Sequence, residues 1–285
     1  MSNLPREHHR LDTHARHRDK TLAALLWTAR FRWTASGIVD DLLGGNGLAR
    51  KMIERKLLVE HPINNAFSPV RFYATLSREG LALLQRQWVA IGNGLHGETA
   101  TRLSDCWTLP ERPEHRIRQA RFMHDLHVQA LLAGAFRTNY PIACIHLADD
   151  LERTRPEERP TKIPDVIIEL RSEGTSAERQ TTKNWGEVEI GRKNQREVDL
   201  FCAYYRGALA GLSERGFDKL FVYCHESVLA QWRKDFARTV VPRWQFRKAT
   251  RDWLRLDAKD WHHFPNISTE EVENTIRLLP RFRER

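Results

Sequence analysis

The chain has 285 residues, 41% of them hydrophobic, and a formal net charge of +9 with a pI of about 9.6. This length allows one large or two ordinary domains, and no apolar run approaches the roughly 18 residues that a membrane-spanning helix needs. The positive net charge favours a polyanionic partner, most of all nucleic acid, but it does not indicate the fold.

The start of the chain is polar and rich in histidine and arginine, so it lacks the apolar segment of a secretory signal. We therefore expect a cytoplasmic protein. Its cysteines are far apart and form no Cys-x-x-Cys pair, which predicts free thiols and argues against zinc. Residues 1–18 predict a flexible basic arm, with contact to DNA phosphate or a stray metal site as the alternatives.

Residues 19–92 show the apolar spacing of a small helical domain. Apolar side chains recur at three- and four-residue intervals, and Ser77 stands where it can cap a closing helix. The predicted order is a helix from 19, a helix over 37–43 capped by Thr34 or Ser36, a glycine-rich turn over 44–47, a helix from 48 to about 59, a loop, a strand over 70–76 and a helix from 77 to about 91.

This order resembles a winged helix-turn-helix, and residues 72–84 resemble the passage from wing to last helix in bacterial regulators. The resemblance implies double-stranded DNA as a partner, with the third helix in the major groove. The alternative is a helical domain that contacts proteins, in which the basic residues are merely solvated. The candidate DNA-binding residues are Arg50, Lys51, Arg55 and Lys56 on the third helix and Arg71 in the wing.

Glycine and proline punctuate residues 93–114, which predict a linker. The second domain, residues 115–285, then opens with a long helix that carries His124 and His127. Two histidines three residues apart invite a metal interpretation. Because no cysteine or third ligand is near in sequence, we expect no zinc there, and the alternative is a helix with a few polar residues near a site or in the core.

Two short strands organise this second domain. Bulky and β-branched residues predict strands over 162–170 and 185–193, and the polar stretch over 172–184 predicts a hairpin-like loop between them. Farther along, the sequence predicts a helix over 195–212, a strand over 217–224, a helix from Ser227 to Arg238, a strand over 244–249 and a last helix over 270–279.

Both strands carry acids. Asp165 stands at the start of the first, and Glu187 and Glu189 share one face of the second because side chains alternate along a strand. If the strands pair, the three carboxylates can converge, and they then need a divalent cation between them, which predicts Mg²⁺ or Mn²⁺. The alternative is a chance Pro-Asp pair beside a solvated Glu-x-Glu face.

An acid after proline, a loop, Glu-x-Glu on a strand and a nearby lysine resemble the PD-(D/E)XK nuclease core. The sequence departs from the family pattern at Glu189, where lysine is usual, and Lys193 stands four residues on. The resemblance implies Asp165, Glu187, Glu189 and Lys193 as catalytic residues, with the three acids as metal ligands. It further implies assistance from the first core helix, through His124 or His127, and Gln195 stands beside the acids at the entrance of the next helix.

The order of motifs over about residues 20–225 is similar to that of the bacterial replication-relaxation family and of MobC-type plasmid mobilisation relaxases. The implied fold is α/β (α+β): a winged helix-turn-helix, then a PD-(D/E)XK restriction-endonuclease-like domain with a central mixed sheet flanked by helices. The implied partners are double-stranded DNA, such as a transfer origin, and accessory mobilisation proteins.

The leading hypothesis is a metal-dependent DNA endonuclease or nickase with water as the nucleophile. A covalent route through Tyr204 or Tyr205 is less favoured, because Tyr205 falls on an apolar stripe. The alternatives are a DNA-binding replication initiator or regulator with an inactive nuclease-like domain, and an RNA-processing enzyme. Residues 228–259 hold nine Lys/Arg against three Asp, with three tryptophans interleaved, which indicates either a DNA-facing surface or core tryptophans under a basic exterior.

Overall fold

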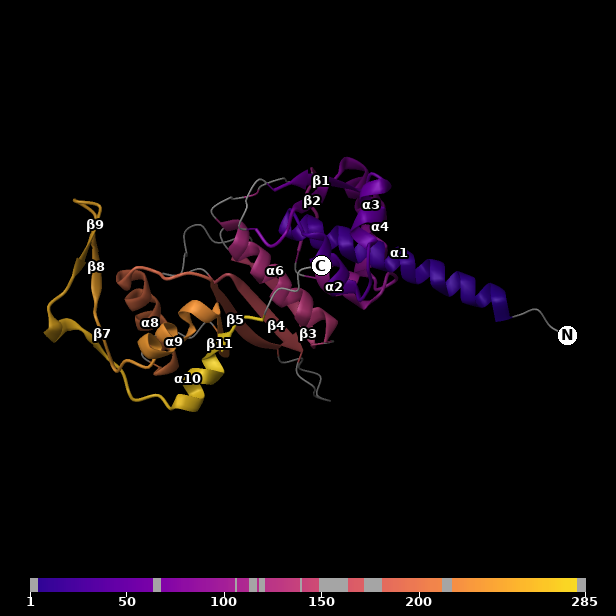
Figure 1. The fold of residues 1–285 in the computed structure, drawn as a ribbon. Helices are drawn as coiled ribbons and strands as arrows, with labels where there is room; N and C mark the ends of the chain where they lie inside the picture. Colours follow the sequence, from indigo (N-terminus) through magenta and orange to yellow (C-terminus); the bar gives the residue numbers. More distant parts are fainter. Residues whose placement is uncertain are drawn as a thin grey trace. The chain divides into compact units, whose positions relative to one another are not determined.

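The structure is a computed structural model that describes residues 5–63, 68–105, 107–112, 117, 121–138, 140–148, 164–171, 181–211 and 217–280 (Figure 1). The chain divides into two compact units. The first holds residues 1–145 with 170–179 and 281–285, and the second holds 146–169 with 180–280. Among the helices described, none combines the length and the apolar character needed to cross a bilayer.

The first unit is a set of helices around a small β-hairpin. In chain order it contains α1 (Pro5–Phe31), α2 (Ser36–Leu43), α3 (Leu48–Glu54), β1 (Leu58–Pro62), β2 (Phe72–Leu76), α4 (Arg78–Gly92), α5 (Glu98–Ser104) and α6 (Phe122–Arg137). β1 and β2 pair antiparallel, from Leu58 opposite Leu76 to Pro62 opposite Phe72. Thr34, between α1 and α2, extends the hairpin through backbone hydrogen bonds of 2.9 and 2.8 Å with Ala74.

Three details describe where the helices of the first unit begin and end. The predicted cap is confirmed, since Ser77 Oγ accepts a hydrogen bond from the Gly80 N–H at 2.9 Å. Helix α3 ends at Glu54 rather than near residue 59, because Lys56 adopts a left-handed conformation (φ 59°) and turns the chain into β1. Helix α2, by contrast, begins after Ala35 without the side-chain cap expected from Thr34 or Ser36.

The ends of the first unit differ from expectation. Residues 5–18, expected as a flexible arm, form the first half of α1, because a helix extends at little cost once its buried part has formed. Within the expected linker, α5 buries Ala100 and Leu103. Helix α6 also belongs to this unit: Trp27 Nε1 donates to Gln129 Oε1 at 3.1 Å.

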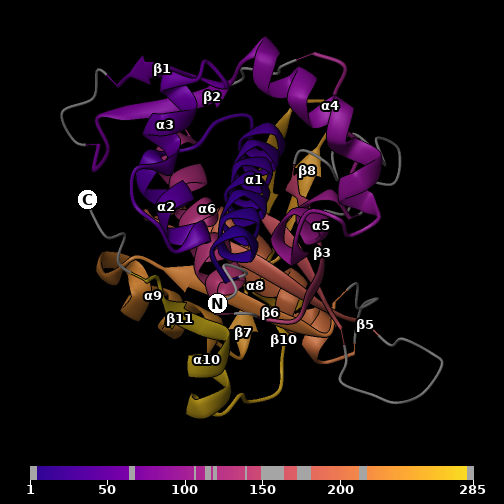
Figure 2. The same ribbon diagram turned by 90° about the vertical axis from the view of Figure 1, so that its right-hand side faces the viewer.

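The second unit is built on a mixed five-stranded sheet in the order β11-β6-β5-β4-β3 (Figure 2). The strands are β3 (Ile142–Leu147), which begins in the first unit, β4 (Val166–Arg171), β5 (Thr181–Glu189), β6 (Lys219–Cys224) and β11 (Ile276–Leu278). β5 runs parallel to β6, and β6 runs parallel to β11. Because β5 and β6 are parallel neighbours, the helix between them, α8 (Gln195–Leu209), is a crossover connection.

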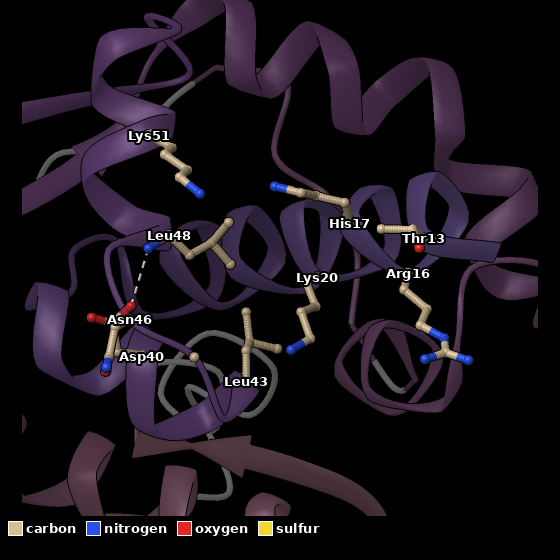
Figure 3. A pocket seen from close by; sticks show the side chains of 10 residues that line it. Thr13, Arg16, His17, Lys20, Asp40, Leu43, Asn46, Leu48 and Lys51 are labelled. Atoms are coloured by element: carbon tan, nitrogen blue, oxygen red, sulfur yellow. Dashed lines mark hydrogen bonds between the residues drawn. The ribbon is translucent and has the colours of Figure 1, made fainter. Parts of the chain in front are cut away.

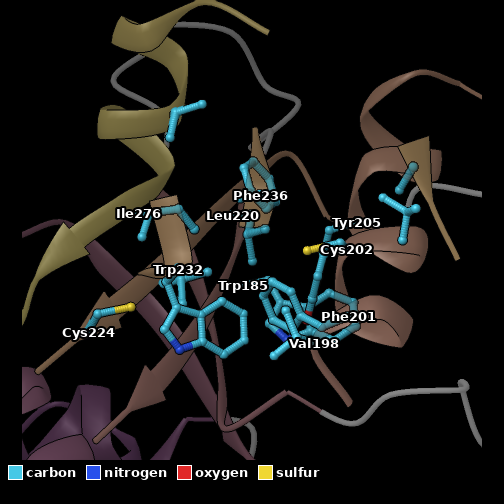
Figure 4. Packing of buried hydrophobic residues seen from close by; sticks show 14 of the residues in the cluster. Trp185, Val198, Phe201, Cys202, Tyr205, Leu220, Cys224, Trp232, Phe236 and Ile276 are labelled. Atoms are coloured by element: carbon cyan, nitrogen blue, oxygen red, sulfur yellow. The ribbon is translucent and has the colours of Figure 1, made fainter. Parts of the chain in front are cut away.

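A hydrophobic core packs on one face of this sheet (Figure 4). Trp185 of β5 lies opposite Leu220 of β6, and Tyr205 of α8 packs edge-on against Trp185 with ring centroids 5.2 Å apart. Helices α9 (Glu226–Phe236) and α10 (Thr269–Thr275) complete the cover through Trp232, Phe236 and Val272.

Several predicted boundaries in the second unit need correction. β5 already begins at Thr181, inside the predicted loop. His225 rather than Ser227 caps α9, and Ile276–Leu278 is the edge strand β11 rather than the end of a helix. The strand predicted over 244–249 is β8 (Trp244–Arg247), which pairs with β9 (Asp252–Arg255) in a separate hairpin instead of joining the central sheet.

The described cysteines agree with the expected thiol state. Cys144, Cys202 and Cys224 are free and buried. Cys106 lies outside the described residues.

Candidate active site

Close packing between β4 and β5 brings Asp165 beside the acidic strand. A Cβ atom at Gly186 would lie 2.8 Å from Val166 Cγ1, so only glycine allows the strands to approach this closely. Asp165, half-buried just before β4, accepts a hydrogen bond from the Val188 N–H at 2.9 Å. The aspartate is thus held at the backbone between the two glutamates of β5.

The Glu187 carboxylate is enclosed by the core, with 0% of the residue exposed. Its Oε1 accepts hydrogen bonds from Trp185 Nε1 at 3.1 Å and from the Tyr205 hydroxyl at 2.9 Å. Both donors are neutral, so they satisfy hydrogen bonds without neutralising a charge. Burial raises the pKa of Tyr205 well above its ordinary value, and the charges of Glu187 and Asp165 add to the effect.

Glu189, two residues on, has a different partner. The Lys193 ammonium donates a hydrogen bond to Glu189 Oε1, and the same ammonium lies 5.8 Å from the centroid of the Trp232 ring. Glu189 is buried, whereas Lys193 remains partly exposed. The lysine therefore stands at the edge of the acidic strand with one side toward solvent.

The structure does not gather the three acids at one point. Within the part of the chain that it describes, no group of three or more His, Cys, Asp or Glu side chains is close enough to hold a metal ion. Asp165 and Glu187 both act on the Tyr205 hydroxyl, while Glu189 is engaged by Lys193. This differs from the expected convergence of three metal ligands.

The chemistry of Asp165 and Glu187 nevertheless fits a hard divalent cation. Carboxylate oxygens are the ligands that Mg²⁺ and Mn²⁺ prefer. Glu187 is fully buried, and a bound cation would offset the cost of burying its charge. These two side chains would hold such an ion.

The predicted assisting residues make contacts within their own helices. Gln195 donates to Asp199 Oδ1 at 3.0 Å, at the start of α8. His124 and His127 are on α6, in the first unit, where His124 Nδ1 is 3.0 Å from Asp125 Oδ1.

The predicted DNA-binding residues all lie on the surface of the first unit. All five, from α3, the turn after it and the segment before β2, are exposed: Arg50, Lys51, Arg55, Lys56 and Arg71. Leu48, Ala49 and Met52 form the buried side of α3. Lys51 also lines a cavity of about 270 Å³ together with Arg16, His17 and Lys20 of α1, so basic side chains of α1 and α3 share one hollow (Figure 3).

Sequence reasoning missed Trp185 as part of the site and considered Tyr205 only as a disfavoured nucleophile. Tyr205 was placed on an apolar stripe, which is correct, but its hydroxyl reaches Glu187 from that stripe. A buried tyrosine normally finds a hydrogen-bond partner, and that rule was the available signal. The buried hydroxyl also makes Tyr205 a poor nucleophile, because its raised pKa keeps it protonated.

The chain matches no family model, no curated protein and no solved structure. Function must therefore be inferred from the residues and their geometry.

Proposed function

We propose that this protein is a metal-dependent DNA endonuclease or nickase, which binds a DNA site through its first unit and cleaves the strand with its second. The observation that carries the proposal is the buried Glu187, held by Trp185 and Tyr205 on β5 beside an aspartate fixed to the same strand. A buried carboxylate beside a second acid is an oxygen-rich arrangement of the kind that suits a hard divalent cation.

Two features of the first unit support DNA binding. The order α1, α2, α3, β1, β2, α4 is that of the winged helix-turn-helix which the sequence resembles. In that arrangement α3 enters the major groove, and its polar side here is formed by exposed basic residues. The net charge of +9 supplies attraction to the phosphate backbone.

The topology of the second unit supports a nuclease-like core. After the acid-bearing strands β4 and β5 the chain continues through α8 into the parallel strand β6. This strand–helix–strand passage is what the resemblance to PD-(D/E)XK nucleases implies at this point. The resemblance to the replication-relaxation family extends the proposal to nicking at a transfer origin with accessory mobilisation proteins.

Each residue then has a stated task. Asp165 and Glu187 would hold the cation, and Trp185 and Tyr205 fix the Glu187 carboxylate in one orientation. When bound, Mg²⁺ or Mn²⁺ supplies an activated water and stabilises charge on the phosphate. Lys193, partly exposed beside Glu189, neutralises the phosphate as negative charge builds on it.

The test is cleavage of a supercoiled plasmid that carries DNA flanking the protein's own gene. We expect native protein to form open circles with Mg²⁺ or Mn²⁺ and not with EDTA. Asp165→Asn should cut about 100-fold more slowly or worse, because the amide still accepts the Val188 N–H but carries no charge. Glu197→Gln, at an exposed position on α8, is the matched control and should cut normally.

A DNA-binding initiator or regulator with an inactive second unit is the second candidate. Two observations favour it: Glu189 stands at the usual lysine position, and its carboxylate is paired with Lys193. Tight binding to the same DNA with no cleavage by the native protein would select this candidate over the nuclease.

A further inference from the structure

We propose that the β8–β9 hairpin is a binding surface for single-stranded DNA, which stacks unpaired bases on Phe246 and Trp253. This adds a second DNA-contacting surface to the protein and does not depend on cleavage by the acidic site. In Figure 1 the two strands project from α8 and α9 as a narrow ribbon.

The base of the ribbon is anchored by buried polar groups. Trp244, the first residue of β8, donates its indole N–H to Asp199 of α8 at 3.0 Å, and Arg238 also binds this fully buried aspartate. Arg206 of α8 donates to the carbonyl oxygens of Phe236, Arg238 and Pro265. Phe236 and Arg238 precede the segment that contains β8 and β9, and Pro265 follows it.

A short strand pair closes the same base. β7 (Val240–Val241) pairs antiparallel with β10 (His262–His263) just inside these anchors. A chain held at both ends in this way presents its tip without a large loss of conformational entropy when a ligand binds.

The register of the hairpin places its aromatic side chains on one face. Trp244 lies opposite Arg255, and Phe246 lies opposite Trp253, so these four side chains point the same way. The rings of Phe246 and Trp253 are 5.3 Å apart between centroids, and the Arg196 guanidinium of α8 lies 5.8 Å from the Trp253 ring. Phe246 is nevertheless 45% exposed.

The charge around this face fits a polyanion. Between residues 243 and 259 the chain carries six basic residues and two acidic ones. The turn itself contributes exposed Lys248 and Arg251. Exposed aromatic rings beside arginines are the combination that holds single strands, because every base has a face that can stack. Contact with duplex phosphates alone would leave the exposure of Phe246 unexplained.

The decisive experiment measures binding by fluorescence anisotropy in EDTA, which removes cleavage from the result. The probes are a labelled single strand of about 20 nucleotides, the same sequence as a duplex, and a strand of equal length that lacks its bases. We expect Phe246→Ala to weaken single-strand binding about five-fold or more, with duplex binding unchanged. Native protein should bind the baseless strand about as weakly as the variant binds the normal one.

Tyr140→Ala is the matched control, because Tyr140 is also 45% exposed but lies in the first unit. It should leave all three affinities unchanged. The proposal is overturned if Phe246→Ala binds the single strand as tightly as native protein, if duplex binding falls equally, or if native protein binds the baseless strand at full strength. Circular dichroism establishes that each variant is folded.

Discussion

Glu187 shows how one side chain connects the packing of the second unit to its proposed chemistry. It is buried in the aromatic core and receives hydrogen bonds from Trp185 and Tyr205. We expect Tyr205→Phe to lower the free energy of unfolding by about 1.5–3 kcal/mol, because a hydrogen bond to a charged group is lost without a compensating one. Urea unfolding of the second unit measures this.

A double-mutant cycle tests whether Glu187 is the cause. In a Glu187→Gln background, Tyr205→Phe should cost clearly less, since the bond to a neutral amide is weaker. Equal losses in both backgrounds would show that the Tyr205 hydroxyl stabilises the fold through another group. Tyr204→Phe, which leaves the Tyr205–Glu187 bond intact, provides the comparison on the same helix.

The buried thiols predict a loss of stability in alkali. Burial raises the pKa of Cys202 from 9.0 to about 12, although nearby Arg238 lowers it, and burial likewise raises the pKa of Cys224 to about 12. The unfolded chain releases these protons near pH 9, whereas the folded chain keeps them until about pH 12. Stability therefore falls as pH rises through this window, by about 1.4 kcal/mol per pH unit for each thiol.

Urea titrations at about pH 10 and pH 11, inside the window between the two pKa values, measure this slope. Replacing Cys202 by alanine should make the slope smaller by about 1.4 kcal/mol per pH unit, which is the contribution of one thiol. A slope that is unchanged in this variant would contradict the assigned cause.

Among the elements, α4 depends on a glycine at its first turn. A Cβ atom at Gly80 would lie 2.2 Å from the carbonyl oxygen of Leu57, so the backbone itself must move to admit it. We expect Gly80→Ala to destabilise the first unit by about 1–3 kcal/mol. Thermal unfolding followed by circular dichroism measures the change.

Gly134, within α6, provides the control, because the same substitution is expected to raise stability there. An added Cβ there meets nothing within 4 Å, so Gly134→Ala should stabilise the helix by about 0.5–1 kcal/mol. A similar loss in both variants would mean that the close approach of α4 to Leu57 is not the reason for Gly80.

The sequence predicted long or strongly patterned elements and missed those defined by distant contacts. The first helices of the first unit, strand β2 and the cap at Ser77 were visible in local spacing and in the capping residue. Strand β1 was missed, because pairing with β2 defines it. Strand β11 was mistaken for the end of a helix, because only pairing with β6 makes Ile276–Leu278 extended. Helix α5 offers just two buried apolar residues, too few for a periodic signal.

For the candidate site, too, local patterns predicted the residues, and contacts between distant residues were missed. Asp165, Glu187, Glu189 and Lys193 stand on or beside the expected strands, since alternation along a strand is a local rule. Spacing could not show that Glu189 pairs with Lys193 while Glu187 turns into the core. That outcome depends on Trp185 and Tyr205, whose side chains meet only after α8 has crossed to the sheet.

For the molecule as a whole, the net charge of +9 makes DNA binding depend on salt. We expect Lys51→Ala and Arg55→Ala, changes at exposed positions on and next to α3, each to reduce the slope of log affinity against log salt by about one. Lys219→Ala, at the exposed start of β6, should leave the slope unchanged. Equal slopes for all three variants and native protein would rule out phosphate contact by α3.

The central claim is that Asp165 and Glu187 hold a divalent cation, and Mn²⁺ binding tests it without knowledge of the DNA site. Electron paramagnetic resonance measures free Mn²⁺ as protein is added. Native protein should bind one ion, and Asp165→Asn and Glu187→Gln should each abolish binding, with Glu197→Gln unaffected. If native protein binds no Mn²⁺, or if both variants bind as much as native protein, the proposed active site is wrong.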